Sequence, residues 1–338
     1  MNQAVDTLTI DDFSSDQEVR WCPGCGDYAV LKTIQKLMPE LKRPRESQVF
    51  VSGIGCSSRF PYYMETYGFH TIHGRAPSVA TGVKLANPEL DVWVITGDGD
   101  ALSIGGNHTM HALRRNVDLN ILLFNNEIYG LTKGQYSPTS KVGTRSPSTP
   151  DGSIDRPLSP CAIAFGAGAA FVARSIDTEM KHLSAVVKEA HAHEGASFVE
   201  ILQNCPIYND GIFEQVKNKK IAPDFRVEAE HGQPLLFGKD KNKGIRLNSE
   251  TLSLEVVNLG ENAELDDILV HNQTNLEQAQ LLAAMQGPDF PVAIGILYYN
   301  PVTAYVADVS DQKLKLRESR GQGDLGKLLL SGHTWIVK

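Results

Sequence analysis

The 338-residue chain is predicted to fold as an α/β protein with a doubly wound, mostly parallel sheet. Short, almost continuously apolar runs alternate with helical segments between residues 26 and 205. Such runs are typical of strands that are covered on both faces. The expected strands are VFVS (49–52), VWVIT (92–96), LNILLF (119–124) and FVEIL (198–202).

Two helices are expected between these strands, over residues 103–116 and 178–193. Asp177 is the expected N-cap of the second helix, and Gly195 follows its end. The apolar face of this helix would consist of Leu183, Val186, Val187 and Ala190.

Changes in composition divide the chain into three parts. We expect an N-terminal arm, one domain and a C-terminal extension that wraps a partner or covers the core, over residues 1–20, 21–210 and 211–338. The domain includes a long Ser-, Pro- and Gly-rich loop at 134–160, which is a length typical of functional loops. The extension contains weak periodicity near 265–285 and a strand-like segment at 292–299.

Charge and cysteine content exclude several classes of protein. The formal charge of −8 argues against binding to nucleic acid or anionic membranes. No apolar run approaches the roughly 18 residues that span a bilayer, and the first residues do not resemble a signal peptide. Five cysteines without a secretion signal indicate a reducing compartment, so a cytoplasmic location is expected.

Polar, Gly-rich turns follow the four expected strands directly. They read GIGCSSR, GDGDALSIGGNH, NNEIYGLTKGQ and QNCP in chain order. Because ligands of open α/β sheets bind outside the carboxyl ends of the strands, these turns could share one crevice.

The GDGD turn has the composition of a site for a metal and a phosphate. Gly97 and Gly99 permit close approach of the backbone to a phosphate, and Asp98 is a hard ligand suited to Mg²⁺. An Asn-Asn pair follows after 25 further residues, so Asn126 and the carbonyl of Ile128 could complete the metal site. The alternative is a pair of Gly-rich turns without a ligand.

The C-x-x-C formed by Cys22 and Cys25 has three interpretations from its residues alone. It could be a redox dithiol, half of a zinc site or half of an iron–sulfur site. Spacing does not decide among them.

The combined string GIGCSSR…HGRA…TGDGDALSIGGNH…NNEIYGLTKGQ resembles the diphosphate-binding motif of thiamine pyrophosphate enzymes. It is most similar to the β subunits of 2-oxoacid:ferredoxin oxidoreductases, particularly the 2-oxoglutarate type, over about residues 18–215. The resemblance implies the thiamine-diphosphate-binding fold, with only the diphosphate-binding module in this chain.

The same resemblance implies one [4Fe–4S] cluster near the thiamine. Its ligands would be Cys22, Cys25, Cys56 and Cys205. Zinc remains the alternative for four thiolates, although structural zinc usually takes two C-x-x-C pairs. Cys161 would then be a buried thiol without a ligand role.

The resemblance also implies the remaining site residues. His73 is the catalytic candidate, and Arg59 with Leu131 would bind substrate, Arg59 by gripping its distal carboxylate. The expected cofactor-binding residues are Ile54, Gly55, Cys56, Ser57, His73, Gly74, Arg75, Ala76, Gly97, Asp98, Gly99, Asp100, Asn126, Gly130 and Leu131. Asp98, Asn126 and Ile128 would bind Mg²⁺.

The activity implied is thiamine-dependent oxidative decarboxylation of 2-oxoglutarate to succinyl-CoA and CO₂, or the reverse. Thiamine pyrophosphate, Mg²⁺ and the cluster would be the cofactors, coenzyme A the co-substrate and ferredoxin the electron partner. An α subunit would have to supply the pyrimidine-binding module, in an expected (αβ)₂ heterotetramer. Pyruvate or another 2-oxoacid as substrate, a non-redox thiamine-dependent decarboxylase or synthase, and a zinc-containing structural subunit are the alternatives.

Overall fold

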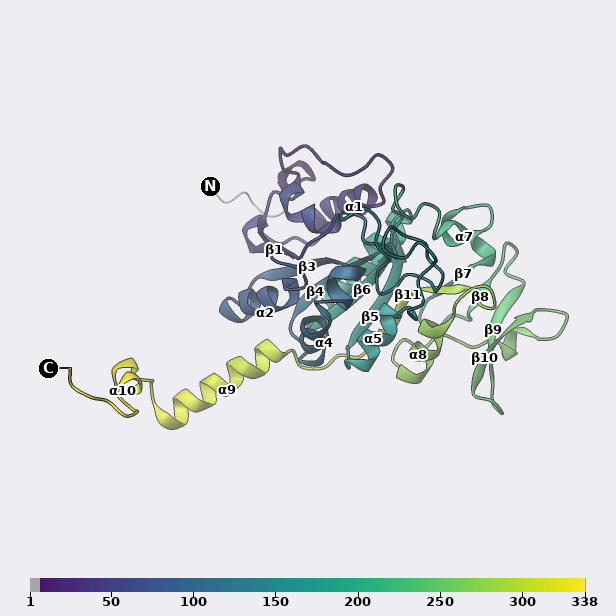
Figure 1. The fold of residues 1–338 in the computed structure, drawn as a ribbon. Coiled ribbons are helices and arrows are strands. Elements are labelled where there is room, and N and C mark those ends of the chain that lie inside the picture. Colours follow the sequence, from purple (N-terminus) through teal and green to yellow (C-terminus); the bar gives the residue numbers. More distant parts are fainter. Residues whose placement is uncertain (1–6, 338) are drawn as a thin grey trace.

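A computed structural model describes residues 7–337, which form an eight-stranded sheet with the order β2-β1-β3-β4-β6-β5-β11-β7 (Figure 1). Neighbouring strands are parallel except β11, which runs antiparallel to β5. The strands are β1 (Gln48–Ser52), β2 (Tyr67–His70), β3 (Asp91–Gly97), β4 (Leu119–Asn125), β5 (Phe171–Ile176), β6 (Ala196–Leu202), β7 (Arg226–Ala229) and β11 (Val292–Tyr299). The four predicted strands are confirmed as β1, β3, β4 and β6.

Helices cover both faces of the sheet. Successive residues of β3 point to opposite faces. Trp93 and Ile95 belong to the core cluster that includes residues of α1 and α6, whereas Val92 and Val94 belong to the cluster on the other face, which includes residues of α2, α4, α5 and α8. The two buried cores confirm the doubly wound architecture. The helices are α1 (Asp27–Glu40), α2 (Ala76–Ala86), α3 (Asp98–Leu102), α4 (Gly106–Arg114), α5 (Pro160–Gly166), α6 (Met180–Ala192), α7 (Glu214–Lys217), α8 (Leu276–Ala284), α9 (Tyr305–Arg320) and α10 (Leu325–Leu329).

Both predicted helices differ in detail from the observed ones. The helix predicted at 103–116 is α4, which spans only Gly106–Arg114 and follows a turn after α3; in that turn a side chain at Gly105 would collide with the carbonyl oxygen of Asp100. The N-cap position of α6 is Glu179, whose side chain makes no capping hydrogen bond, so Asp177 as the N-cap was wrong. The Asp177 carboxylate instead accepts hydrogen bonds from Asn204 N and Lys217 Nζ. The predicted apolar face of α6 is buried as expected.

The region after residue 210, predicted as an extension, contributes strands to the main sheet. Its strands β7 and β11 belong to the main sheet, and the strand predicted at 292–299 is β11. A separate antiparallel sheet consists of β8 (Leu236–Phe237), β9 (Lys243–Asn248) and β10 (Ser253–Asn258). The boundary predicted at residue 210 therefore does not separate one sheet from the other.

The two ends of the chain differ in how they lie relative to the domain. Residues 1–6 of the predicted arm lie outside the described residues, and the rest packs onto the domain through the fully buried Phe13 and a bridge between Ser14 and Met64. At the other end α9 and α10 extend away from the body (Figure 1). None of the helices within residues 7–337 is long and apolar enough to cross a membrane.

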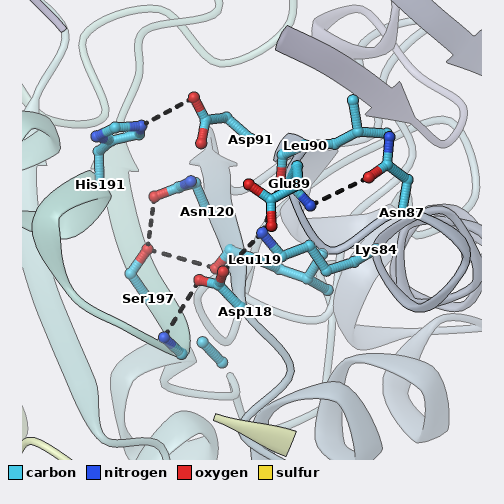
Figure 2. Close-up of polar contacts among 12 residues, drawn as sticks. Lys84, Asn87, Glu89, Leu90, Asp91, Asp118, Leu119, Asn120, His191 and Ser197 are labelled. Atoms are coloured by element: carbon cyan, nitrogen blue, oxygen red, sulfur yellow. Dashed lines mark hydrogen bonds and ion pairs between the residues drawn. The ribbon is translucent and has the colours of Figure 1, made fainter. Parts of the chain in front are cut away.

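Polar contacts tie the elements together at the amino ends of β3, β4 and β6 (Figure 2). Lys84 Nζ lies 2.7 Å from an oxygen of Asp118 and donates to the carbonyl of Leu90. On the same edge His191 Nε2 lies 3.4 Å from an oxygen of Asp91. This edge is held by local ion pairs, whereas the predicted site residues lie at the opposite, carboxyl edge.

Candidate functional site

Asp100 joins three turns at the carboxyl edge of the sheet. Its Oδ1 accepts hydrogen bonds from the backbone N–H groups of Ile54 (3.1 Å) and Gly74 (2.7 Å), and its Oδ2 accepts one from Thr96 Oγ1 (2.7 Å). His73 Nδ1 lies 2.6 Å from the same Oδ1. Asp100 is buried and both of its oxygens accept hydrogen bonds, so its role is to hold these turns in place. The His73 side chain is 38% exposed and can reach a ligand.

Asp98, two residues earlier, is a buried carboxylate in a different setting. Thr139 Oγ1 donates to its Oδ2 at 2.6 Å and lies 3.0 Å from Asn125 Oδ1. Burial raises the pKa of Asp98, because the ionised form loses its hydration. A divalent cation beside this carboxylate would offset that cost, so the residue fits the metal role predicted for it.

Asn126 and Ile128 lie on the turn that follows the neighbouring strand. Pairing of Gly97 with Phe124 places the carboxyl ends of β3 and β4 side by side. Asn126 Oδ1 accepts from the Ile128 N–H at 3.2 Å, and Asn126 Nδ2 donates to Gln203 Oε1 at 2.8 Å. This turn therefore carries an amide oxygen and a carbonyl oxygen, which are oxygen types that Mg²⁺ prefers.

Two glycines of the crevice are required by close packing. A side chain at Gly99 would collide with the ring of Tyr129, whose hydroxyl donates to the Gly99 carbonyl at 3.0 Å. Gly74 has a φ of +69°, and a side chain there would collide with the backbone of Gly105. These contacts fix the backbone where the sequence predicts an approach to phosphate.

The four predicted cluster cysteines line one cavity of about 190 Å³. A side chain at Gly130 would lie 3.4 Å from Cys205 Sγ and 3.7 Å from Cys56 Sγ, so Gly130 leaves this space open. The cavity also contains Arg59, Leu131 and Asn126. Its lining residues from the N-terminal and late turns include Arg20, Trp21, Cys22, Cys25, Gln203, Pro206 and Tyr208.

Burial raises the pKa of the Cys25 thiol strongly and that of Cys56 to about 12. These thiols therefore remain protonated unless a metal displaces the proton. Trp21 Nε1 donates to the Cys56 carbonyl at 2.7 Å and connects two of the cysteine-bearing segments. Cys161 lies elsewhere, fully buried, and donates to Glu200 Oε2 at 3.1 Å, as expected for the cysteine without a ligand role.

Zinc and a cubane cluster require different spacings of their four thiolates. Tetrahedral zinc with Zn–S bonds of about 2.3 Å needs sulfurs roughly 3.8 Å apart. Within residues 7–337 no group of three or more His, Cys, Asp or Glu side chains is placed to hold a single metal ion. A cubane cluster separates its four thiolates more widely, because each binds a different iron.

Arg59 lies in the cysteine cavity, as its position after Cys56 predicts. Its backbone N–H donates to the Cys56 carbonyl at 3.2 Å, and its Nε donates to the hydroxyl of buried Tyr63 at 3.1 Å. Leu131 is half exposed at the same opening. Of the other predicted contacts, Ser57 and Ala76 are buried, and Arg75 donates to the carbonyls of His73 and Ile104.

Sequence reasoning missed several residues that form hydrogen bonds to the predicted site residues. Thr139 lies in the long loop at 134–160, whose length was the one signal that it serves the site. Gln203 and Trp21 each adjoin a predicted ligand segment in the sequence, and Tyr63 lies four residues after Arg59. Adjacency to a predicted ligand could have identified these three.

Comparisons with known proteins agree with this geometry. Residues 53–201 match the family model "Thiamine pyrophosphate enzyme, C-terminal TPP binding domain". The chain is 50% identical over 331 residues to 2-oxoglutarate oxidoreductase subunit KorB of Mycobacterium tuberculosis, covering 96% of this chain and 88% of that protein. It is 45% identical over 203 residues to the 2-oxoacid:ferredoxin oxidoreductase subunit beta of Saccharolobus solfataricus, covering 60% of this chain and 67% of that protein.

A solved structure extends the likeness to three dimensions. The 2-oxoglutarate:ferredoxin oxidoreductase from Magnetococcus marinus, determined with 2-oxoglutarate, coenzyme A and succinyl-CoA bound, matches with a TM-score of 0.75 and 31% identity, covering 97% of each chain. The predicted thiamine-diphosphate-binding fold is confirmed by these matches. The chain belongs to the family of 2-oxoacid:ferredoxin oxidoreductase β subunits.

Proposed function

We propose that the chain is the β subunit of a CoA-acylating 2-oxoglutarate:ferredoxin oxidoreductase. The observation that carries this proposal is one cavity that contains four cysteines from three separate segments together with Asn126 of the diphosphate-binding turns. A non-redox thiamine enzyme has no use for that arrangement. The printed names of the relatives and the ligands of the M. marinus structure support 2-oxoglutarate and coenzyme A as substrates.

The cofactors proposed are thiamine pyrophosphate, Mg²⁺ and one [4Fe–4S] cluster. When bound, thiamine pyrophosphate supplies the electron sink for loss of CO₂ from a 2-oxoacid, and the cluster takes up electrons one at a time. Asp98, Asn126 and the Ile128 carbonyl would hold Mg²⁺ against the diphosphate. Cys22, Cys25, Cys56 and Cys205 would hold the cluster.

The chain's own residues shape the crevice for these groups. Asp100 fixes the turns of Ile54 and Gly74, and it lies against His73, whose side chain is partly exposed. We propose that His73 contacts the cofactor or the reacting substrate from this position. The backbone of Gly97 and Gly99 would lie against the diphosphate. The remaining predicted contacts would line the rest of the cofactor site. They are Gly55, Ser57, Arg75, Ala76, Gly130 and Leu131.

Arg59 is the proposed reader of the substrate's distal carboxylate. Tyr63 holds its Nε, which leaves the terminal nitrogens of the guanidinium to bind a carboxylate. Leu131 at the same opening would pack against the methylene groups between the two ends of the substrate.

Catalysis would require an α subunit to supply the pyrimidine-binding module, because the family model matched within the described residues is the TPP binding domain at 53–201. Both relatives are named as subunits, and the S. solfataricus relative is named as subunit beta, which supports such a partner. We propose an (αβ)₂ assembly in the cytoplasm that delivers electrons to ferredoxin.

The test is a panel of 2-oxoacids assayed anaerobically with the complex of this chain and its α subunit. Ferredoxin reduction should depend on both 2-oxoglutarate and coenzyme A and should form succinyl-CoA. Pyruvate should be a poor substrate. Decarboxylation without ferredoxin reduction would favour the non-redox alternative, and equal turnover of pyruvate would remove the 2-oxoglutarate assignment.

A further inference from the structure

Gln203 lies between the cysteine cavity and the diphosphate-binding turns. It is the first residue after β6, and its backbone N–H donates to the Asn125 carbonyl at 2.9 Å. Its side chain is buried, with 1% of the residue exposed. A buried amide must satisfy both ends, so its partners are informative.

The partners of the Gln203 amide come from both halves of the site. Nε2 donates to Cys25 Sγ at 3.3 Å and to the Asn204 carbonyl at 2.7 Å. Oε1 accepts from Asn126 Nδ2 at 2.8 Å. The orientation of the amide is determined, because the reverse would place its oxygen against the Asn204 carbonyl oxygen.

We propose that Gln203 is a positioning residue that couples the cluster site to the metal site. Through Nε2 it holds the sulfur of Cys25 and raises the reduction potential of the cluster, and through Oε1 it orients Asn126 toward Mg²⁺. The inference rests on the proposed function, because it assigns Cys25 to the cluster and Asn126 to the metal.

The physical basis of each contact is separate. An N–H···S hydrogen bond withdraws electron density from a cluster thiolate, so it favours the reduced, more negative state. At the other end, donation by Asn126 Nδ2 fixes that nitrogen away from the metal and leaves Oδ1 as the ligand atom. Outer partners of this kind typically change metal affinity by roughly 10- to 100-fold.

Two substitutions separate the contacts. Gln203→Leu removes both the donor and the acceptor. Gln203→Glu removes the N–H donor to Cys25 but keeps an oxygen for Asn126. Gln278→Leu and Gln278→Glu are matched controls, because Gln278 is a buried, hydrogen-bonded glutamine in α8 that contacts His271 and Asn272 instead.

The measurements are made on the anaerobic complex with the α subunit. Iron content and an EPR-monitored redox titration report the cluster, and calorimetry with thiamine pyrophosphate and Mg²⁺ on complex depleted of both reports the metal site. Both Gln203 variants should shift the reduction equilibrium about tenfold toward the oxidised cluster, about 59 mV for one electron. Only Gln203→Leu should weaken binding of thiamine pyrophosphate and Mg²⁺, by roughly tenfold or more.

A wild-type potential in Gln203→Glu would contradict the N–H···S role. Wild-type affinity in Gln203→Leu would contradict the positioning of Asn126, and shifts of equal size in the Gln278 controls would contradict both. If Gln203→Leu does not assemble, Gln203→Glu still decides the first point, and Gln203→Met takes its place for the second. Failure of the proposed function is distinguishable, because it would appear in the wild-type complex as absent iron or absent 2-oxoglutarate-dependent ferredoxin reduction.

Discussion

Asp98 and Asp100 lie two residues apart, and both were predicted to contact the cofactor. The structure separates their surroundings. Asp100 is surrounded by donors from Ile54, Gly74 and Thr96, whereas burial raises the pKa of Asp98. The Asp100 carboxylate, which accepts these hydrogen bonds, holds the backbone of the turns in place. The Asp98 carboxylate, which has lost its hydration, is suited to bind a cation.

Asp98→Asn should abolish tight binding of thiamine pyrophosphate with Mg²⁺, by at least roughly 100-fold, because a charged metal ligand is lost. The cofactor-free protein should be as stable as wild type or more stable, since a buried charge is removed while Thr139 keeps an oxygen acceptor. Calorimetry and thermal unfolding measure the two effects. Asp91→Asn, at the opposite edge of the sheet, should lower stability with affinity unchanged.

Arg59→Ala should change substrate choice. Leaving a bound carboxylate unpaired typically costs about 2–5 kcal/mol, which corresponds to roughly 30-fold to several-thousand-fold in kcat/KM for 2-oxoglutarate. Pyruvate, which lacks the second carboxylate, should be turned over equally well or better. Arg43→Ala is the control, because Arg43 pairs with Asp91 at the opposite edge of the sheet. Equal losses for both substrates would show that Arg59 supports the cysteine turn and does not read the substrate.

At the scale of elements, the first turn of α3, directly after β3, determines how closely a ligand can approach the backbone. Gly99→Ala should cost about 1–3 kcal/mol of stability and weaken cofactor binding, because the new methyl group must displace the Tyr129 ring. Gly82→Ala within α2 meets open space and should stabilise the protein by up to about 1 kcal/mol. Thermal unfolding of both variants provides the comparison, and indifference at Gly99 would show that Tyr129 is free to move.

The end of α6 gives a pH dependence of stability. His193 is buried between Phe171 and Tyr299, and neither ring nitrogen has a hydrogen-bond partner among the described residues. Burial lowers the pKa of His193 below its ordinary 6.5, so in mildly acidic solution the unfolded chain binds a proton that the folded chain does not. Stability should therefore fall as the pH drops below 6.5. His193→Leu should reduce that slope in unfolding measurements between about pH 7.5 and pH 5.5; an unchanged slope would contradict it.

The strands that the sequence predicted have apolar residues buried on both faces of the sheet. Strands with charged or exposed residues were missed. β5 was missed because Arg174 interrupts its apolar run, and only the register reveals that Arg174 lies opposite Glu200 on β6 and pairs with it at 2.7 Å. β2 was missed because all four of its residues are exposed on an edge strand. In both cases the deciding interactions come from another strand, which local periodicity cannot report.

At the scale of the whole molecule, chain order and spatial order differ most after residue 210. β11 inserts between β5 and β7, antiparallel to β5 and parallel to β7, so the last third of the chain completes the main sheet. Its weak periodicity did not predict this. The cavity of the four cysteines has the same origin: the residues suggested a C-x-x-C, but only the family resemblance predicted that Cys56 and Cys205 would join it.

The most direct test of the account is the iron content and EPR spectrum of the anaerobic complex carrying single Cys→Ser variants of this chain. Wild type should contain about four iron atoms per β chain and show the signal of one reduced [4Fe–4S] cluster. Serine at Cys22, Cys25, Cys56 or Cys205 should lower iron and abolish electron delivery to ferredoxin, whereas Cys161→Ser should change neither. Full iron content in the Cys56 or Cys205 variant, or stoichiometric zinc in place of iron in wild type, would contradict the central claim.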